Sequence, residues 1–202
     1  TLEEQDVLFI DEIHRLPAPV EELLYSAMED RRLDLTLAEG LAAQAIQISL
    51  PAFTLVGATT RPGALTAPLR DRFGIKMRLE FYAVEELEGI LQRAANRWNI
   101  VIESDACRMV AERSRRTPRV ALRLLRRIWD FALVELGTVE NQRVQINQDI
   151  VQTSFERMGL DSLGLTHLDI ALLRAMAQDY GGGPVGLKTL AVQLGEDTIT
   201  LE

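Results

Sequence analysis

The sequence predicts an α/β fold in which part of a parallel sheet, with an inserted β-hairpin, is followed by small helical domains. Two apolar runs predict the sheet. The run Val7-Leu8-Phe9-Ile10 leads directly into the acids Asp11 and Glu12, and a second run at residues 53–58 is followed by two threonines. From Val84 onward the apolar residues keep helical spacing, which predicts that only helices follow.

Composition and charge exclude several classes of protein. The chain has 202 residues, 47% of them hydrophobic and 5% aromatic, which suits a helix-rich globular protein. No apolar run approaches the roughly 20 residues that span a bilayer, and no secretion signal opens the chain, so we expect a cytoplasmic protein with no membrane contact. The net charge of −8 argues against general coating of nucleic acid but leaves room for a local basic surface. The single cysteine, Cys107, is expected in the core.

The elements of the sheet domain follow from residue spacing. After the first strand, apolar residues at 20, 23, 24, 27 and 28 predict a helix. Apolar and polar residues then alternate over 33–37 and again over 46–50, and Glu39-Gly40 between them supplies the turn of a long hairpin. A short helix is expected over 69–74, and residues 77–82 resume a strand-like pattern in which the sheet finishes.

Capping residues delimit the helices that follow. We expect four helices, at about 84–98, 104–114, 118–136 and 147–158. Beyond them, Thr166 and Asp169 form a capping-box-like start to a helix over 168–176, and Gly181-Gly182-Gly183-Pro184 breaks it. A second short helix at about 187–194 completes a helix-turn-helix type module.

Asp11 and Glu12 lie where the first strand ends, the edge at which parallel sheets place catalytic groups. In nucleotide-hydrolysing folds the first acid of such a pair holds Mg²⁺ through water, and the second polarises the water that attacks the γ-phosphate. The alternative is a buried strand whose acids cap the next turn. His14 follows closely, but with only one other histidine, His167, and no cysteine nearby a zinc site lacks ligands, so we expect His14 to be structural.

Four segments resemble, in order, motifs of the AAA+ ATPases. These are the Walker B strand at 7–16, sensor 1 at 57–60, the arginine-finger segment at 69–74 and the sensor 2 sequence Thr117-Pro118-Arg119. Within that superfamily the chain resembles the RuvB family, because the acidic strand continues as Ile13-His14-Arg15-Leu16 and a long hairpin precedes sensor 1. The resemblance implies three domains: the C-terminal portion of a large ATPase domain at 1–82, a small helical lid at 83–155, and a truncated winged-helix DNA-binding domain at 156–202.

The resemblance also implies a role for each site residue. The implied catalytic residues are Asp11, with Mg²⁺ held through water, Glu12, the sensor 1 hydroxyl of Thr60, and the arginine finger Arg72, which acts in a neighbouring subunit's site. The residues implied to contact ATP are Glu29, Asp30, Arg31, Tyr82 and the sensor 2 residue Arg119. Structural roles are open for three of these residues: a turn threonine for Thr60, an ion pair with Asp71 or Glu80 for Arg72, and core packing for Tyr82.

The resemblance further implies a hexameric, ATP-driven DNA translocase that powers branch migration of Holliday junctions. Its implied partners are copies of itself, Holliday junction DNA, a resolvase and a RuvA-like junction-binding protein. RuvA is implied to dock on hairpin 33–50, at Leu37, Leu41 and Ile46, and the apolar hairpin tip fits this because exposed apolar surface usually has a partner. The alternative is a hairpin folded onto its own domain.

One motif of the family is missing from these 202 residues, because no G-x-x-x-x-G-K-[ST] loop occurs. The segment 181–189 comes near, but Leu187 intrudes before Lys188. We therefore expect a fragment that is truncated at both ends and inactive by itself, with its DNA-contacting residues outside the chain. Two alternatives stay open: a clamp-loader-like AAA+ subunit, and an interaction scaffold that does not hydrolyse ATP.

Overall fold

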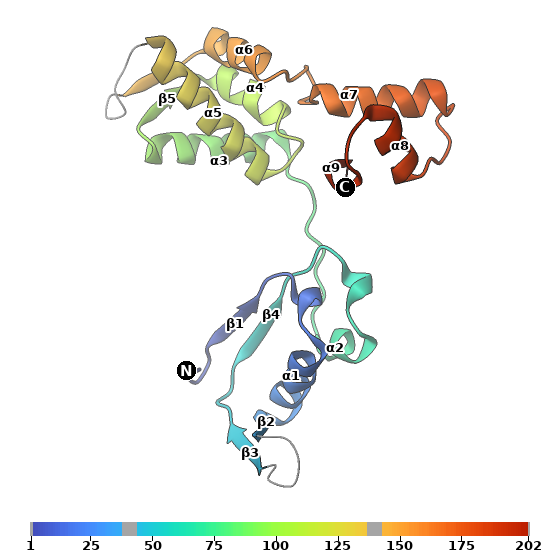
Figure 1. Cartoon of the computed structure of the whole chain (residues 1–202). Helices are drawn as coiled ribbons and strands as arrows, with labels where there is room; N and C mark the ends of the chain where they lie inside the picture. Colours follow the sequence, from blue (N-terminus) through green and yellow to red (C-terminus); the bar gives the residue numbers. More distant parts are fainter. Residues whose placement is uncertain (1, 38–43, 137–142, 202) are drawn as a thin grey trace. The chain divides into compact units, whose positions relative to one another are not determined.

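The chain forms two compact units, Thr1–Arg78 and Leu79–Glu202 (Figure 1). The computed structural model describes residues 2–37, 44–136 and 143–201. Within those ranges, no helix has both the length and the apolar character needed to cross a membrane.

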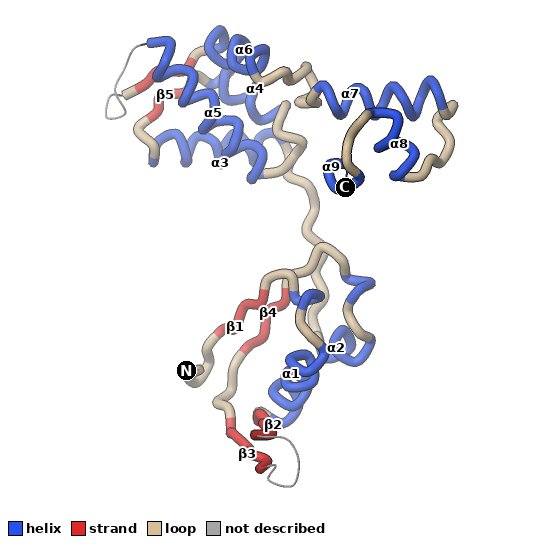
Figure 2. The backbone as a smooth tube through the Cα atoms, in the orientation of Figure 1, coloured by secondary structure: helices blue, strands red, loops and turns tan. Residues whose placement is uncertain are grey.

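The first unit contains the predicted pair of parallel strands. Strand β1 (Val7–Ile10) pairs with β4 (Thr54–Gly57), with Val7 opposite Thr54 and Ile10 opposite Gly57 (Figure 2). The pairing continues past the strand ends, because the amide of Ala58 donates to the carbonyl of Ile10 at 2.9 Å and the amide of Ile13 donates to that of Ala58 at 3.0 Å. The residues that follow each strand are therefore held side by side.

Strand β1 differs from the expectation of a buried strand. Val7 is 65% exposed and Phe9 is 59% exposed, whereas Leu8 and Ile10 are partly buried. Successive side chains of a strand point to opposite faces of the sheet, and here one of those faces is open in the described residues. The four apolar residues of β1 indicate a buried strand, whereas the structure leaves one of its faces exposed.

Helix α1 (Ala18–Asp30) and the hairpin follow β1 as predicted. Strands β2 (Arg32–Leu37) and β3 (Gln44–Ser49) are antiparallel, and Arg32 lies opposite Ser49. The predicted turn at Glu39-Gly40 lies outside the described residues. Helix α1 ends at Arg31, which adopts a left-handed backbone (φ 52°) and so turns the chain directly into β2.

The predicted strand at 77–82 is wrong. The chain instead has a single-turn 3₁₀ helix η2 (Pro62–Ala64), helix α2 (Ala67–Arg72) and then an irregular segment, in which Met77 and Leu79 are almost fully exposed. Alternating apolar residues form a strand only when a neighbouring strand accepts their hydrogen bonds. Strands β1 and β4 pair with each other, and no third strand lies beside them among the described residues.

The second unit begins with the four predicted helices, α3 (Val84–Arg97), α4 (Ser104–Glu112), α5 (Pro118–Leu136) and α6 (Gln148–Arg157). The expectation that only helices follow residue 84 is wrong, because β5 (Ile100–Ile102) and β6 (Val144–Ile146) form a parallel pair. Three-residue strands are too short to show a period. Cys107 is buried in the core of these helices, as predicted. The largest fully buried side chains of this core belong to Leu87, Leu91, Ile100, Val110, Leu125, Ile128, Val144, Ile146, Val151 and Phe155.

The last helices of the second unit are α7 (His167–Arg174), a π-helical turn η3 (Ala175–Asp179), α8 (Leu187–Leu194) and α9 (Thr198–Leu201). The predicted capping box is present, because the side chains of Thr166 and Asp169 each bond the other's backbone amide. Helix α8 ends at Gly195, whose left-handed backbone (φ 67°) is the usual end of a helix.

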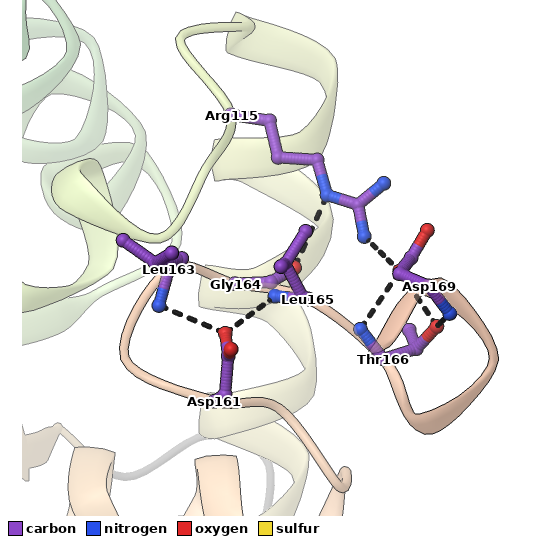
Figure 3. A network of polar contacts seen from close by, with 7 residues as sticks. All are labelled: Arg115, Asp161, Leu163, Gly164, Leu165, Thr166 and Asp169. Atoms are coloured by element: carbon purple, nitrogen blue, oxygen red, sulfur yellow. Dashed lines mark hydrogen bonds and ion pairs between the residues drawn. The ribbon is translucent and has the colours of Figure 1, made fainter. Parts of the chain in front are cut away.

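A joint of residues 113–116 and 161–169 connects the four-helix part of this unit to α7 (Figure 3). Arg115 donates from Nε to the carbonyl of Gly164 at 3.1 Å, and its guanidinium also pairs with Asp169. The Asp161 carboxylate accepts from the amides of Leu163 and Leu165, each at 2.8 Å. The joint therefore satisfies the backbone of its own loop and ties that loop to the turn before α5.

Candidate functional site

The acids after β1 and the threonines after β4 meet at one edge of the sheet. The Thr60 hydroxyl donates to Oε2 of Glu12 at 3.1 Å, although 48 residues separate them. Glu12 has a left-handed backbone (φ 49°, ψ 44°), which is uncommon for a residue other than glycine, asparagine or aspartate. It starts a single-turn 3₁₀ helix η1 (Ile13–Arg15). The two strand ends thus build one polar cluster, as their parallel pairing requires.

His14 also belongs to this cluster, and the sequence did not predict its contacts there. Its Nδ1 lies 2.8 Å from the Thr59 hydroxyl oxygen and 3.2 Å from Oε2 of Glu12, and its side chain is 7% exposed. The Thr59 hydroxyl also accepts the amide of Arg61 at 3.0 Å. The only signal in the sequence was that His14 lies two residues beyond Glu12. This spacing indicates a contact only when η1 is known, because η1 brings the imidazole near the Glu12 carboxylate.

Asp11 fits a water-mediated Mg²⁺ contact. Its carboxylate is exposed, takes the amide of Glu12 on Oδ1 at 3.0 Å, and makes no ion pair with any residue that the structure describes. No group of three or more histidine, cysteine, aspartate or glutamate side chains occurs in the described ranges that would hold a metal without help from water or substrate. Magnesium ordinarily keeps several waters and binds through one or two carboxylates plus phosphate oxygens. An exposed oxygen donor at a strand end suits that role.

Arg72 is held by contacts within its own chain. Its Nη2 lies 2.7 Å from Oε2 of Glu29, its Nη1 donates to the carbonyl of Pro68 at 3.0 Å, and its guanidinium carbon is 4.7 Å from the centre of the Tyr25 ring. The open alternative of an intrachain ion pair for Arg72 is found here, but its partner is Glu29 of α1 and not Asp71 or Glu80. Glu29, implied to contact ATP, and Arg72, implied to act in a neighbouring subunit's site, are therefore neighbours.

Arg72 and Arg31 also line one cavity of about 340 Å³ at the end of α1. The other walls of this cavity are mostly apolar and include Met28 and Phe73. Asp30 is turned to the hairpin instead, where it pairs with Arg32 at 3.2 Å. Of the three candidates at 29–31, Glu29 therefore pairs with Arg72 and Arg31 lines the same cavity as Arg72.

The remaining nucleotide candidates, Tyr82 and Arg119, lie in the second unit. Tyr82 is 41% exposed and exchanges hydrogen bonds with Arg116, since its amide donates to the Arg116 carbonyl and its carbonyl accepts Nε of Arg116, each at 3.1 Å. Tyr82 is therefore not part of the hydrophobic core of the second unit. Arg119 is exposed in the first turn of α5 and makes no ion pair with the described part of the chain.

The candidate partner residues on the hairpin are only partly described. Ile46 is 41% exposed in β3, and its neighbour on the same face, Ile48, is exposed to a similar extent. Leu37 pairs with Gln44 in the ladder, and Leu41 lies outside the described residues. The described part of the hairpin thus presents apolar side chains to solvent.

Comparison with known proteins identifies three family segments in order. Residues 1–79 match the family described as Holliday junction DNA helicase RuvB P-loop domain. Residues 82–161 match the RuvB AAA lid domain, and residues 162–202 match the RuvB C-terminal winged helix domain.

Individual relatives agree with these family matches. The chain is 53% identical over 201 residues to the Holliday junction branch migration complex subunit RuvB of Myxococcus xanthus, and it spans 57% of that protein's length. The structure of the Thermotoga maritima RuvB Holliday junction branch migration motor is 47% identical, with a TM-score of 0.76 over 99% of this chain and 60% of that one. A mutant of the Thermotoga maritima protein gives a TM-score of 0.79 at 46% identity, over 100% of this chain and 61% of that one.

Proposed function

Because the chain belongs to the RuvB family of AAA+ ATPases, we propose that it is part of an ATP-driven motor that moves the branch point of Holliday junctions. The observation that carries this proposal is the hydrogen bond from Thr60 to Glu12. It joins the acid expected to orient water with the hydroxyl expected to sense the γ-phosphate, at the sheet edge where phosphoryl transfer is ordinarily catalysed.

Asp11, Glu12 and Thr60 would each have a separate role in ATP hydrolysis. When bound, Mg²⁺ supplies positive charge to the phosphate oxygens, and Asp11 would hold it through water. The Glu12 carboxylate would accept a hydrogen bond from the attacking water and so direct a lone pair of that water toward phosphorus. The Thr60 hydroxyl is neutral, so it can bridge that water and a phosphate oxygen without repelling either. ATP and Mg²⁺ are therefore the proposed ligands.

Arg72 is proposed to complete the site of an adjacent subunit. Its guanidinium is held by Glu29 and the Tyr25 ring, and its side chain is 28% exposed, so part of it is open to another copy. An arginine that neutralises charge on the transferring phosphoryl group contributes about 10³ to 10⁵ in rate. This role requires a ring of copies, so a homohexamer forms part of the proposal.

Partners and location follow from the same function. The exposed face of β3 supports docking of a RuvA-like protein on hairpin 33–50, at Leu37, Leu41 and Ile46. Holliday junction DNA is the proposed substrate, and a resolvase is a further proposed partner. Because the proposed substrate is cellular DNA, the proposed location is the cytoplasm. The inactivity of these 202 residues alone stays a prediction. The clamp-loader alternative is not retained, since all three family matches are to RuvB domains.

Mixing two inactive variants of the full-length protein tests the shared site. Glu12→Gln and Arg72→Ala should each lower ATP turnover by about 100-fold or more, because each removes a group that acts on the γ-phosphate. A mixture should regain part of the turnover, since some interfaces join an intact acid cluster to an intact arginine. Arg108→Ala is the matched control, because Arg108 pairs with Glu88 and Glu112 on the surface of the lid helices.

The outcome separates the proposed motor from a scaffold. No recovery in the mixture, with each variant still forming rings, would contradict the shared site. Full activity of Glu12→Gln would contradict hydrolysis at this sheet edge and favour a scaffold that only holds partners.

A further inference from the structure

His14 has a largely buried polar side chain that the proposed chemistry does not use. It follows Glu12 on η1, and its side chain is closed off from solvent while Glu12 remains 35% exposed. One ring nitrogen, Nδ1, lies within hydrogen-bonding distance of both Glu12 and Thr59. The ring therefore stands between the acid that follows β1 and the hydroxyl that follows β4.

The chemistry of the two contacts determines which atom donates. An ionised carboxylate only accepts hydrogen bonds, so the 3.2 Å contact between Nδ1 and Oε2 of Glu12 is attractive only if Nδ1 carries a proton. The Thr59 hydroxyl already accepts the amide of Arg61, but a hydroxyl oxygen has two lone pairs and can accept Nδ1–H as well. Nδ1 carries a single proton, which makes the hydrogen bond to Thr59, and Oε2 of Glu12 lies beside the same N–H group at ion-pair distance.

The donors to Glu12 gather on one of its two oxygens. Thr60 donates to Oε2 at 3.1 Å, and Nδ1 of His14 faces the same Oε2. Within the described residues, Oε1 receives no hydrogen bond. A carboxylate held by one oxygen points the other in a defined direction, which is the geometry that a water-orienting acid needs.

We propose that His14 is a positioning residue, whose polar Nδ1–H group, fixed by its hydrogen bond to Thr59, attracts Oε2 of Glu12 so that Oε1 faces the attacking water. This inference rests on the proposed role of Glu12 in ATP hydrolysis. The left-handed backbone of Glu12 explains why a support is needed, because a residue in a disfavoured conformation keeps it only when its surroundings hold it. Thr59 anchors the imidazole to β4, so the support is tied to the strand that also carries Thr60.

Steady-state ATPase kinetics of three variants of the full-length protein test the proposal. His14→Ala should lower kcat by about 10- to 100-fold while KM for ATP stays within about twofold, because the orientation of Glu12 matters to the transition state and not to nucleotide binding. His14→Asn places an amide donor near the position of Nδ1 and should recover most of the loss. His14→Gln places its amide near the far end of the ring and should not.

A double-mutant cycle distinguishes positioning from packing. In a Glu12→Gln background, measured in single turnover, His14→Ala should cause no further loss, because the group through which it acts is already gone. Thermal unfolding and binding of a fluorescent ATP analogue check that each variant is folded. If His14→Ala does not fold, the Asn and Gln variants carry the comparison.

Three results would overturn the inference: wild-type kcat in His14→Ala, equal kcat in the Asn and Gln variants, or a His14→Ala loss that multiplies with that of Glu12→Gln. The proposed function fails differently. In that case Glu12→Gln alone would leave turnover unchanged, whatever the His14 variants do.

Discussion

At the scale of single residues, the site depends on how closely side chains pack behind it. Gly57 ends β4, and a Cβ atom built on it would lie 2.9 Å from Cδ1 of Ile13 and 3.1 Å from Cζ of Phe73. Ile13 is fully buried and is the residue directly after Glu12. The absence of a side chain at 57 therefore lets η1 approach β4 closely enough for the polar cluster to form.

Gly57→Ala should destabilise the first unit by about 1 to 3 kcal/mol, because Ile13 or Phe73 must move to make room. Gly63→Ala is the matched control, since a Cβ atom there meets nothing within 4 Å. Urea unfolding measures both. Equal midpoints for the two variants would show that the contact behind the site tolerates a methyl group.

Cys107 allows a pH prediction. Burial, followed by the charge of Glu88, raises the pKa of the Cys107 thiol from 9.0 to about 11. A pKa that is higher in the folded state means that this thiol contributes stability fully below about pH 9 and loses it as the pH rises toward 11. At pH 8 the folded protein should carry about 100-fold less thiolate than the unfolded chain.

Alkylation by iodoacetamide at pH 8, followed by mass spectrometry, should therefore label Cys107 rapidly in urea and very slowly in the native protein. Labelling should accelerate in the native protein between pH 9 and 11. Rapid labelling of the native protein at pH 8 would mean that the thiol is not closed off by α3 and α4.

At the scale of elements, the joint between the four-helix part and α7 depends on the backbone conformation of Gly164. Gly164 has φ +76°, and a Cβ atom on it would lie 2.1 Å from the carbonyl oxygen of Arg113. Arg113 in turn places its guanidinium 4.7 Å from the centre of the Phe155 ring. Only glycine allows this approach, so the loop at 161–165 and the turn before α5 are fitted to each other (Figure 3).

Gly164→Ala should open this joint, at a cost of about 3 kcal/mol or more, because both the backbone angle and the contact with Arg113 become unfavourable. Hydrogen exchange should show faster exchange of the Leu163 and Leu165 amides, which Asp161 now holds. Gly182→Ala separates the two causes, since Gly182 also has a positive φ (74°) but open space at its Cβ position. A loss no greater than that of Gly182→Ala would exclude the contact as a cause.

The elements of the second unit were the most predictable part of the fold. Helices α3 to α6 have apolar residues at helical spacing, and local capping groups such as Asn147 mark their ends, so neighbouring residues alone specify them. The short strands β5 and β6 were not predictable, because each becomes a strand only when the other is beside it. The same reason explains the wrong strand at 77–82, whose alternation lacks a partner in the described residues.

At the scale of the whole molecule, the candidate residues come from both units, and the proposed role of Arg72 needs a second copy. Asp11, Glu12, Thr60 and Arg72 belong to the first unit, whereas Tyr82 and Arg119 belong to the second. Arg72 is paired with Glu29 in its own chain and is proposed to act on another. The proposed shared site needs an assembly, so the mixed-variant experiment measures ATP turnover of the assembly and not of the single chain.

The sequence by itself determined where the two strands end, which residues follow them and which family motifs they form, because these features depend on neighbours along the chain. Only the tertiary structure decided that His14 faces Glu12 and Thr59, and that Glu29 is the acid beside Arg72. Those contacts join residues on different elements, and the pairing of β1 with β4 and of α1 with α2 sets their distances. No local spacing encodes such distances, since they exist only once the elements are packed.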